Sequence, residues 1–193
     1  VEALLHKCEA VGAVLAVDEC FLDFLLEGEG FSTKRLLSTS RKLIILKAFT
    51  KLYGMAGVRL GYALSSDTEL LARMRAAGQP WAVSGLAQAA GIAALDETEY
   101  VAQVRALIET QRPVLADGLR ALGLRVIEGR ANYLLFRAPE ALGEALRRKG
   151  AVLRSCGNYP GLDASWYRTA VRTETENRQL LALLAETLPE VVQ

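Results

Sequence analysis

The chain has 193 residues, of which 51% are hydrophobic and 23% charged, a composition typical of a folded globular protein. Its 23 basic and 22 acidic residues nearly cancel, and no stretch approaches the ~20 apolar residues of a membrane span, so neither a nucleic acid nor a membrane is expected as a partner. Three scattered cysteines and a single histidine give little material for a disulfide framework or a metal site, which favours a cytoplasmic protein without a metal.

The first third of the sequence predicts a helix followed by three strands. Apolar residues recur at helical spacing over residues 1–11, and residues 13–19 form an apolar run typical of a strand covered on both faces of a parallel sheet. Residues 42–49 and 58–64 predict two more strands of this sheet, joined by a glycine-containing loop. Because the chain opens without methionine on a helix that leads into a strand, we expect it to be the later half of a longer protein.

Residues 67–121 have helical periodicity. The pattern predicts a helix that follows Asp67 as its N-cap, a second helix rich in small residues over 84–95, and a third helix that Asp96 caps and that runs to about 121.

The remaining residues alternate between short strands and helices. Residues 124–129, 132–138, 151–156 and 165–172 predict strands, and residues 139–150 and 173–188 predict helices, the last of which has Thr173 or Thr175 as its cap. The predicted fold class is therefore α/β, with part of a large domain over 1–121 and a small α+β domain over 122–193.

Side chains with suitable chemistry stand at the ends of the three predicted strands, where open α/β sheets bind ligands. Lys51 follows the second strand, where partial burial favours the neutral, nucleophilic amine. Asp18 ends the first strand and can hold a proton on a pyridine nitrogen. Arg59 and Thr50 can bind a phosphate. Taken singly, each of these residues is equally compatible with an ordinary surface or turn position.

In combination these residues resemble a known family. FTKLYGMAGVRLGY and VDECFLDF resemble the lysine and aspartate motifs of fold-type I enzymes that depend on pyridoxal 5'-phosphate, in the branch of histidinol-phosphate aminotransferases and their decarboxylating relatives. The resemblance implies pyridoxal 5'-phosphate as cofactor, held covalently by Lys51, with Asp18 at its ring nitrogen and with Thr50 and Arg59 at its phosphate. It also implies a homodimer. Phe21 stands where most aminotransferases of this branch have a tyrosine that bonds the cofactor's phenolic oxygen.

Phe21, Thr50 and the segment RSCGNYPGLDASWYRTAVR are similar to the threonine-phosphate decarboxylase branch. In that branch Arg168 matches the arginine that binds the substrate carboxylate, and Arg154 matches a position that binds phosphate or carboxylate. Asn158 either shapes the substrate pocket or forms a turn.

The resemblance implies decarboxylation of a phosphorylated amino acid, L-threonine O-3-phosphate, to (R)-1-amino-2-propanol phosphate for cobalamin biosynthesis. Two alternatives remain open at this point. One is an aminotransferase of the histidinol-phosphate type, and the other is a truncated, non-catalytic protein.

Overall fold

The computed structural model describes residues 1–191 and divides the chain into two compact units, unit 1 (Val1–Ala102) and unit 2 (from Gln103 onwards). The division falls inside helix α6 (Thr98–Ala121), which carries the chain from one unit to the other. The sequence analysis expects a domain boundary after residue 121, which is where α6 ends. This boundary stays a prediction.

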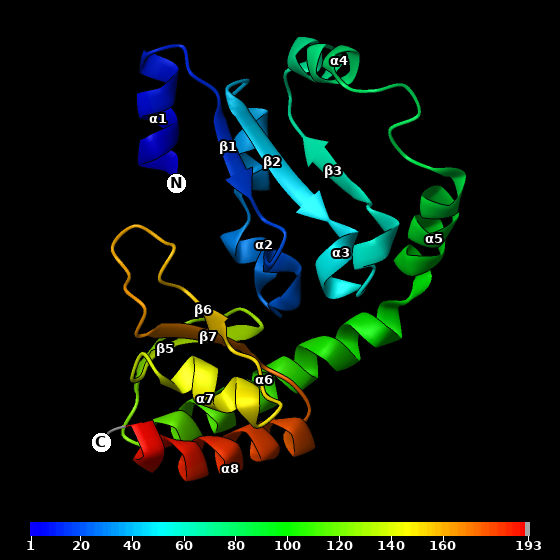
Figure 1. Ribbon diagram of the computed structural model, residues 1–193. Helices are drawn as coiled ribbons and strands as arrows, with labels where there is room; N and C mark the ends of the chain where they lie inside the picture. The colour runs from blue at the N-terminus through cyan, green and yellow to red at the C-terminus, as the bar shows by residue number, and fades with distance from the viewer. Residues whose placement is uncertain (192–193) are drawn as a thin grey trace. The chain divides into compact units, whose positions relative to one another are not determined.

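Unit 1 is built on a sheet of three strands, β1 (Leu15–Asp18), β2 (Leu43–Ala48) and β3 (Gly61–Leu64), in the order β1-β2-β3 (Figure 1). β1 and β2 are parallel, as predicted, but β3 is antiparallel to β2, so the expectation of a wholly parallel sheet is wrong. The reason is the connector: it holds only two short helical turns, α3 (Phe49–Leu52) and η3 (Ala56–Val58), where a parallel return needs a crossover helix.

One face of this sheet is covered and the other is open along β1. Leu43 and Ile45 of β2 pack with Leu5 of α1 (Glu2–Ala10) and with apolar residues of η2 (Thr33–Ser38). Burial alternates along β1, and its second and fourth residues, Ala16 and Asp18, are exposed. The prediction that this strand is buried on both faces is therefore wrong for the described chain.

The segment between β1 and β2 adds two short turns, η1 (Leu22–Phe24) and α2 (Gly28–Phe31). After β3, helix α4 (Thr68–Ala77) begins as predicted, because the Asp67 side chain accepts a hydrogen bond from the Leu70 amide at 3.0 Å. Helix α5 (Gly85–Asp96) extends through Asp96, so the predicted role of Asp96 as the cap of α6 is wrong. In the part of the chain that the structure describes, no helix combines the length and apolar character needed to cross a membrane.

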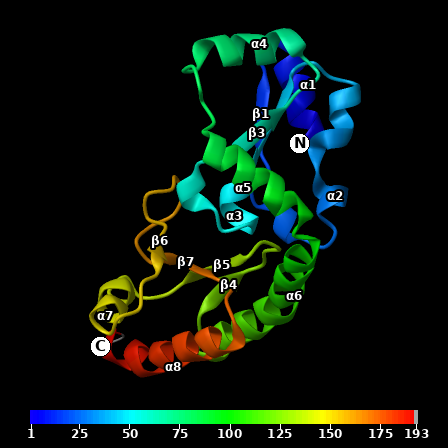
Figure 2. The same cartoon turned by 90° about the vertical axis from the view of Figure 1, so that its right-hand side faces the viewer.

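Unit 2 is a four-stranded antiparallel sheet with helices packed against it (Figures 1 and 2). Its strands are β4 (Arg125–Ile127), β5 (Tyr133–Arg137), β6 (Arg154–Ser155) and β7 (Trp166–Ala170), in the order β4-β5-β7-β6. The core joins the sheet to α6, α7 (Leu142–Arg148) and α8 (Glu174–Val191), and its fully buried apolar side chains are Leu115, Leu119, Leu134, Phe136, Leu142, Leu146 and Leu184. All four predicted strands and both predicted helices are present.

Candidate active site

The carboxylate of Asp18 is fixed at the exposed end of β1. Its Oδ1 accepts a hydrogen bond from the Cys20 amide at 2.9 Å. Hydrogen bonds from the Cys20 thiol and amide, with a smaller contribution from the charge of Lys51, outweigh desolvation and hold the pKa of Asp18 below its ordinary value. Burial, together with the hydrogen bond to Asp18, raises the pKa of the Cys20 thiol to about 11. Asp18 is thus a carboxylate and Cys20 a neutral thiol at neutral pH.

Lys51 lies near this carboxylate, in the short helix α3 that follows β2. Its Nζ is 5.2 Å from the centroid of the Phe21 ring, within the range of a cation–π contact. Lys51 is exposed, and within the described residues its amine makes no hydrogen bond or ion pair. The turn after β1 and the turn after β2 therefore bring together three predicted site residues, Asp18, Phe21 and Lys51.

Thr50 and Arg59 flank the same end of the β2–β3 ladder. The register pairs Ala48 with Gly61, and the Phe49 amide donates to the Leu60 carbonyl at 3.2 Å, so Thr50 and Arg59 come next on either side. Arg59 has the left-handed backbone conformation, with φ 59° and ψ 47°, which is uncommon for a residue other than glycine. Its guanidinium is exposed and, among residues 1–191, donates only to the Ala56 carbonyl, at 3.2 Å, which leaves donors for an anion.

The two predicted substrate arginines lie on adjacent strands of unit 2. Arg154 of β6 is paired with Arg168 of β7 in the antiparallel register. The Arg168 guanidinium lies 4.7 Å from the centroid of the Tyr133 ring, and Arg154 donates to Asn158 Oδ1 at 3.2 Å. Two positive groups that face each other across a ladder repel, and an anion placed between them relieves this repulsion. Tyr133 was not among the predicted site residues.

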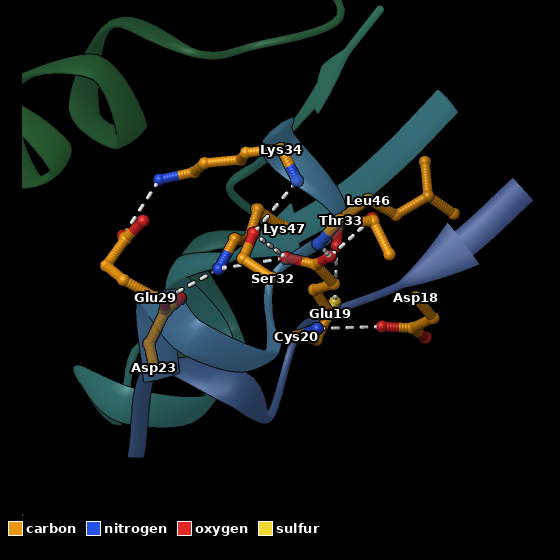
Figure 3. A network of polar contacts seen from close by, with 10 residues as sticks. All are labelled: Asp18, Glu19, Cys20, Asp23, Glu29, Ser32, Thr33, Lys34, Leu46 and Lys47. Atoms are coloured by element: carbon orange, nitrogen blue, oxygen red, sulfur yellow. Dashed lines mark hydrogen bonds and ion pairs between the residues drawn. The ribbon is translucent and has the colours of Figure 1, made fainter. Parts of the chain in front are cut away.

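The sequence reasoning also missed a buried group of charged and polar residues around Lys47, close to Asp18 in the sequence and in the fold (Figure 3). Lys47 of β2 is 4% exposed, and its Nζ lies 2.7 Å from Asp23 Oδ1 and 3.7 Å from Glu19 Oε2. The signal was present in the sequence, because Lys47 lies two and four residues after Ile45 and Leu43 and so must share their buried face.

Comparisons with known proteins place this geometry in a family. A family model described as aminotransferase class I and II matches residues 1–184. The chain is 36% identical over 191 residues to a threonine-phosphate decarboxylase of Salmonella typhimurium, and the aligned region covers 97% of the chain and 52% of that relative. It is 37% identical over 180 residues to a histidinol-phosphate aminotransferase of Symbiobacterium thermophilum, and the aligned region covers 92% of the chain and 48% of that relative.

The fold agrees with these matches. The crystal structure of the histidinol-phosphate aminotransferase from Clostridium acetobutylicum superposes with a TM-score of 0.91 at 28% identity, over 97% of this chain and 58% of that one. The chain spans about half the length of the curated relatives it matches. It therefore belongs to the aminotransferase class I and II family, whose enzymes depend on pyridoxal 5'-phosphate, and it has their type I fold.

Proposed function

We propose that the protein containing this chain is a pyridoxal 5'-phosphate-dependent decarboxylase that converts L-threonine O-3-phosphate to (R)-1-amino-2-propanol phosphate. The observation that carries the proposal is Phe21, whose ring lies 5.2 Å from the Lys51 amine. In most aminotransferases of this branch a tyrosine at this position bonds the cofactor's phenolic oxygen, and phenylalanine has no hydroxyl to do so. The 36% identity with the Salmonella decarboxylase supports the same reading.

The groups in unit 1 fit the cofactor. An aldehyde requires an amine without a competing partner, and Lys51 has neither a hydrogen bond nor an ion pair within the described residues. A protonated pyridine nitrogen requires a carboxylate, and the pKa of Asp18 is held low by its bonds to Cys20. A phosphate requires donors, and Arg59 and Thr50, which both adjoin the end of the β2–β3 ladder, can supply them.

Each of these residues then has a defined task. When bound, the cofactor would supply an electron-accepting ring, the chemistry that loss of carbon dioxide from an α-carbon requires. Asp18 holds the proton on the ring nitrogen, and Arg59 with Thr50 holds the phosphate in place. Lys51 would hold the cofactor at its aldehyde, and its Nζ would be the group placed to return a proton to the α-carbon.

The arginines of unit 2 have the complementary task of binding the substrate's anionic groups. Arg168, held against the Tyr133 ring, binds the carboxylate, and Arg154, oriented by Asn158, binds the phosphate. Fixing both ends of the substrate orients the bond that breaks. The family resemblance also supports a homodimer as the working form of the full-length gene product.

Amino transfer is the second candidate, and the 37% identity with the Symbiobacterium aminotransferase favours it. The same side chains would serve it, but the bond to the α-hydrogen would break in place of the bond to the carboxylate. A keto acid acceptor would then be required.

The test is carbon dioxide release by the full-length gene product from L-threonine O-3-phosphate without any keto acid. We expect one equivalent of carbon dioxide for each equivalent of amine product. Turnover that requires 2-oxoglutarate and releases no carbon dioxide would replace the decarboxylase by the aminotransferase.

The Lys51→Ala variant tests the cofactor link itself. Borohydride reduction of the wild-type protein with pyridoxal 5'-phosphate should attach the cofactor to the peptide that contains Lys51, as measured by mass spectrometry. Lys42→Ala, at the other end of β2, is the matched control and should label as the wild type does. Equal labelling of the Lys51→Ala protein would end the assignment of Lys51.

A further inference from the structure

The buried group around Lys47 is a continuous network of polar contacts (Figure 3). Lys47 donates to Asp23 at 2.7 Å and lies 3.7 Å from Glu19. Glu19 accepts three hydrogen bonds: from the Ser32 hydroxyl at 2.9 Å, from the Thr33 amide at 2.7 Å and from the Thr33 hydroxyl at 2.6 Å. Glu19 is 6% exposed, so its charge is satisfied almost wholly by these protein groups. We call these five residues the Lys47 network.

The Lys47 network lies on the opposite face of the sheet from the Asp18 carboxylate. The parallel register pairs Asp18 with Leu46, and both side chains are exposed. Since successive side chains leave a strand on opposite faces, Glu19 and Lys47 project to the covered face. Asp18 is therefore held in place by the next residue, Glu19, whose side chain is hydrogen-bonded on the covered face of the sheet.

The network also ties the turn after β1 to strand β2, which leads into the turn that carries Lys51. Asp23 follows Phe21 by two residues in the turn after β1, and Lys47 precedes Lys51 by four residues at the end of β2. The contact between Lys47 and Asp23 thus clamps the turn after β1 to the strand that leads to Lys51. In this arrangement the Phe21 ring lies 5.2 Å from the Lys51 amine.

Stability alone does not explain a buried lysine here. A buried ion pair is costly to desolvate, and well-packed apolar side chains of similar volume are often as stable or more stable. Charge-assisted hydrogen bonds differ from apolar contacts in being directional, so they fix one arrangement of the groups that they join. The arrangement that this network fixes is that of Asp18, Phe21 and Lys51.

We propose that Lys47 is a positioning residue for the cofactor site: through Glu19 and Asp23 it locks the turn that carries Asp18 and Phe21 onto the strand that leads to Lys51. This inference rests on the proposed function, because it takes Lys51 and Asp18 as the cofactor-binding groups. It adds a residue whose side chain lies on the far face of the sheet from Asp18.

The test compares Lys47→Met, Lys47→Arg and the control Lys42→Met in the full-length gene product. Amide hydrogen exchange without cofactor should be at least tenfold faster over residues 19–33 in Lys47→Met, since the clamp is gone. The dissociation constant of pyridoxal 5'-phosphate, measured from the absorbance of the lysine-linked form, should rise at least tenfold, and the absorbance maximum should shift. Lys47→Arg should recover most of both losses, and Lys42→Met should match the wild type.

A double variant separates positioning from folding, because Lys47→Met alone leaves Glu19 as a buried charge without its cation. Lys47→Met with Glu19→Gln removes one charge of each sign and should recover thermal stability relative to Lys47→Met. Its cofactor dissociation constant should stay at least tenfold above the wild-type value. If the folded double variant binds the cofactor with wild-type affinity and absorbance, Lys47 has a structural role only and the proposal is wrong.

The wild-type protein distinguishes this failure from a failure of the proposed function. If the wild type forms no absorbance band that depends on Lys51, the cofactor assignment itself fails. If that band forms equally in the wild type and in the Lys47 variants, only the role of Lys47 is overturned.

Discussion

Two consecutive carboxylates at the end of β1 have different surroundings. Asp18 is exposed on the open face of the sheet, whereas Glu19 is 6% exposed on the covered face. Burial raises the pKa of Glu19, but hydrogen bonds from Thr33 and Ser32 and the charge of Lys47 outweigh it, so the pKa lies below its ordinary value of 4.5. One carboxylate is thus available to a ligand while the other is committed to the protein.

The lowered pKa of Glu19 predicts a loss of stability in acid. Because the folded pKa lies below the unfolded value, the contribution of Glu19 is complete above pH 4.5 and is lost as the pH falls through the folded pKa. We therefore expect Glu19→Gln to lower the free energy of unfolding at pH 7, by about 1–3 kcal/mol for a buried charged hydrogen-bonding group. Below pH 4.5 the difference from the wild type should shrink. Urea unfolding at several pH values measures it.

Glu69→Gln, on the exposed surface of α4, is the matched control and should leave the wild-type pH profile unchanged. A difference between Glu19→Gln and the wild type that stays constant from pH 7 into acid would contradict the assignment.

Residue chemistry explains which candidate site residues the sequence indicated. Asp18, Lys51 and Arg59 adjoin the ends of apolar runs, and their types and order match a motif. Lys47 is also a charged residue next to an apolar run, but its task depends on Asp23 and Glu19, 24 and 28 residues earlier. Only the period of two along β2 indicated that Lys47 is buried, and no local pattern indicates its partners.

At the scale of elements, capping chemistry predicted the start of α4 but not that of α6, because Asp96 belongs to α5. Asp67 caps α4 as expected. The third strand was predicted over 58–64 but is only Gly61–Leu64, because Arg59 has a left-handed backbone conformation that no strand accommodates. A left-handed arginine is rare, and the sequence around it gives no signal for it.

The cap of α8 resolves an alternative that the sequence left open between Thr173 and Thr175. The Thr173 hydroxyl donates to Glu176 Oε2 at 2.7 Å, and the Thr173 amide donates to the same oxygen at 3.2 Å. The Glu176 amide approaches the Thr173 hydroxyl at 3.4 Å, which completes a capping box. Thr173→Ala should therefore lower the free energy of unfolding by about 1 kcal/mol. Thermal or urea denaturation measures this change.

Thr175→Ala is the control, because Thr175 is exposed within the first turn of α8. Its effect should stay within about 0.5 kcal/mol, as for other exposed substitutions. Equal losses for the two alanine variants would show that the capping box contributes nothing.

At the scale of the whole molecule, the candidate groups fall into two sets. Lys51, Asp18 and Arg59 belong to unit 1, and Arg154 and Arg168 belong to unit 2. The family resemblance reached both sets because it runs along nearly the whole chain. The two compact units divide inside α6, where the helical pattern of the sequence continues without a break.

The two sets should separate in function if unit 1 binds the cofactor and unit 2 selects the substrate. Arg154→Gln removes one charged donor, and hydrogen bonds to charged groups contribute about 1.5–3 kcal/mol, so KM for L-threonine O-3-phosphate should rise by roughly ten- to a hundredfold. The preference over unphosphorylated L-threonine should fall by the same factor, while the dissociation constant of pyridoxal 5'-phosphate stays unchanged.

Arg172→Gln, which loses an exposed ion pair with Glu176, is the matched control and should alter neither quantity. Steady-state carbon dioxide release and a spectrophotometric cofactor titration measure both effects. A weaker cofactor affinity in Arg154→Gln, or an equal loss for both substrates, would show that Arg154 does not recognise the substrate's phosphate.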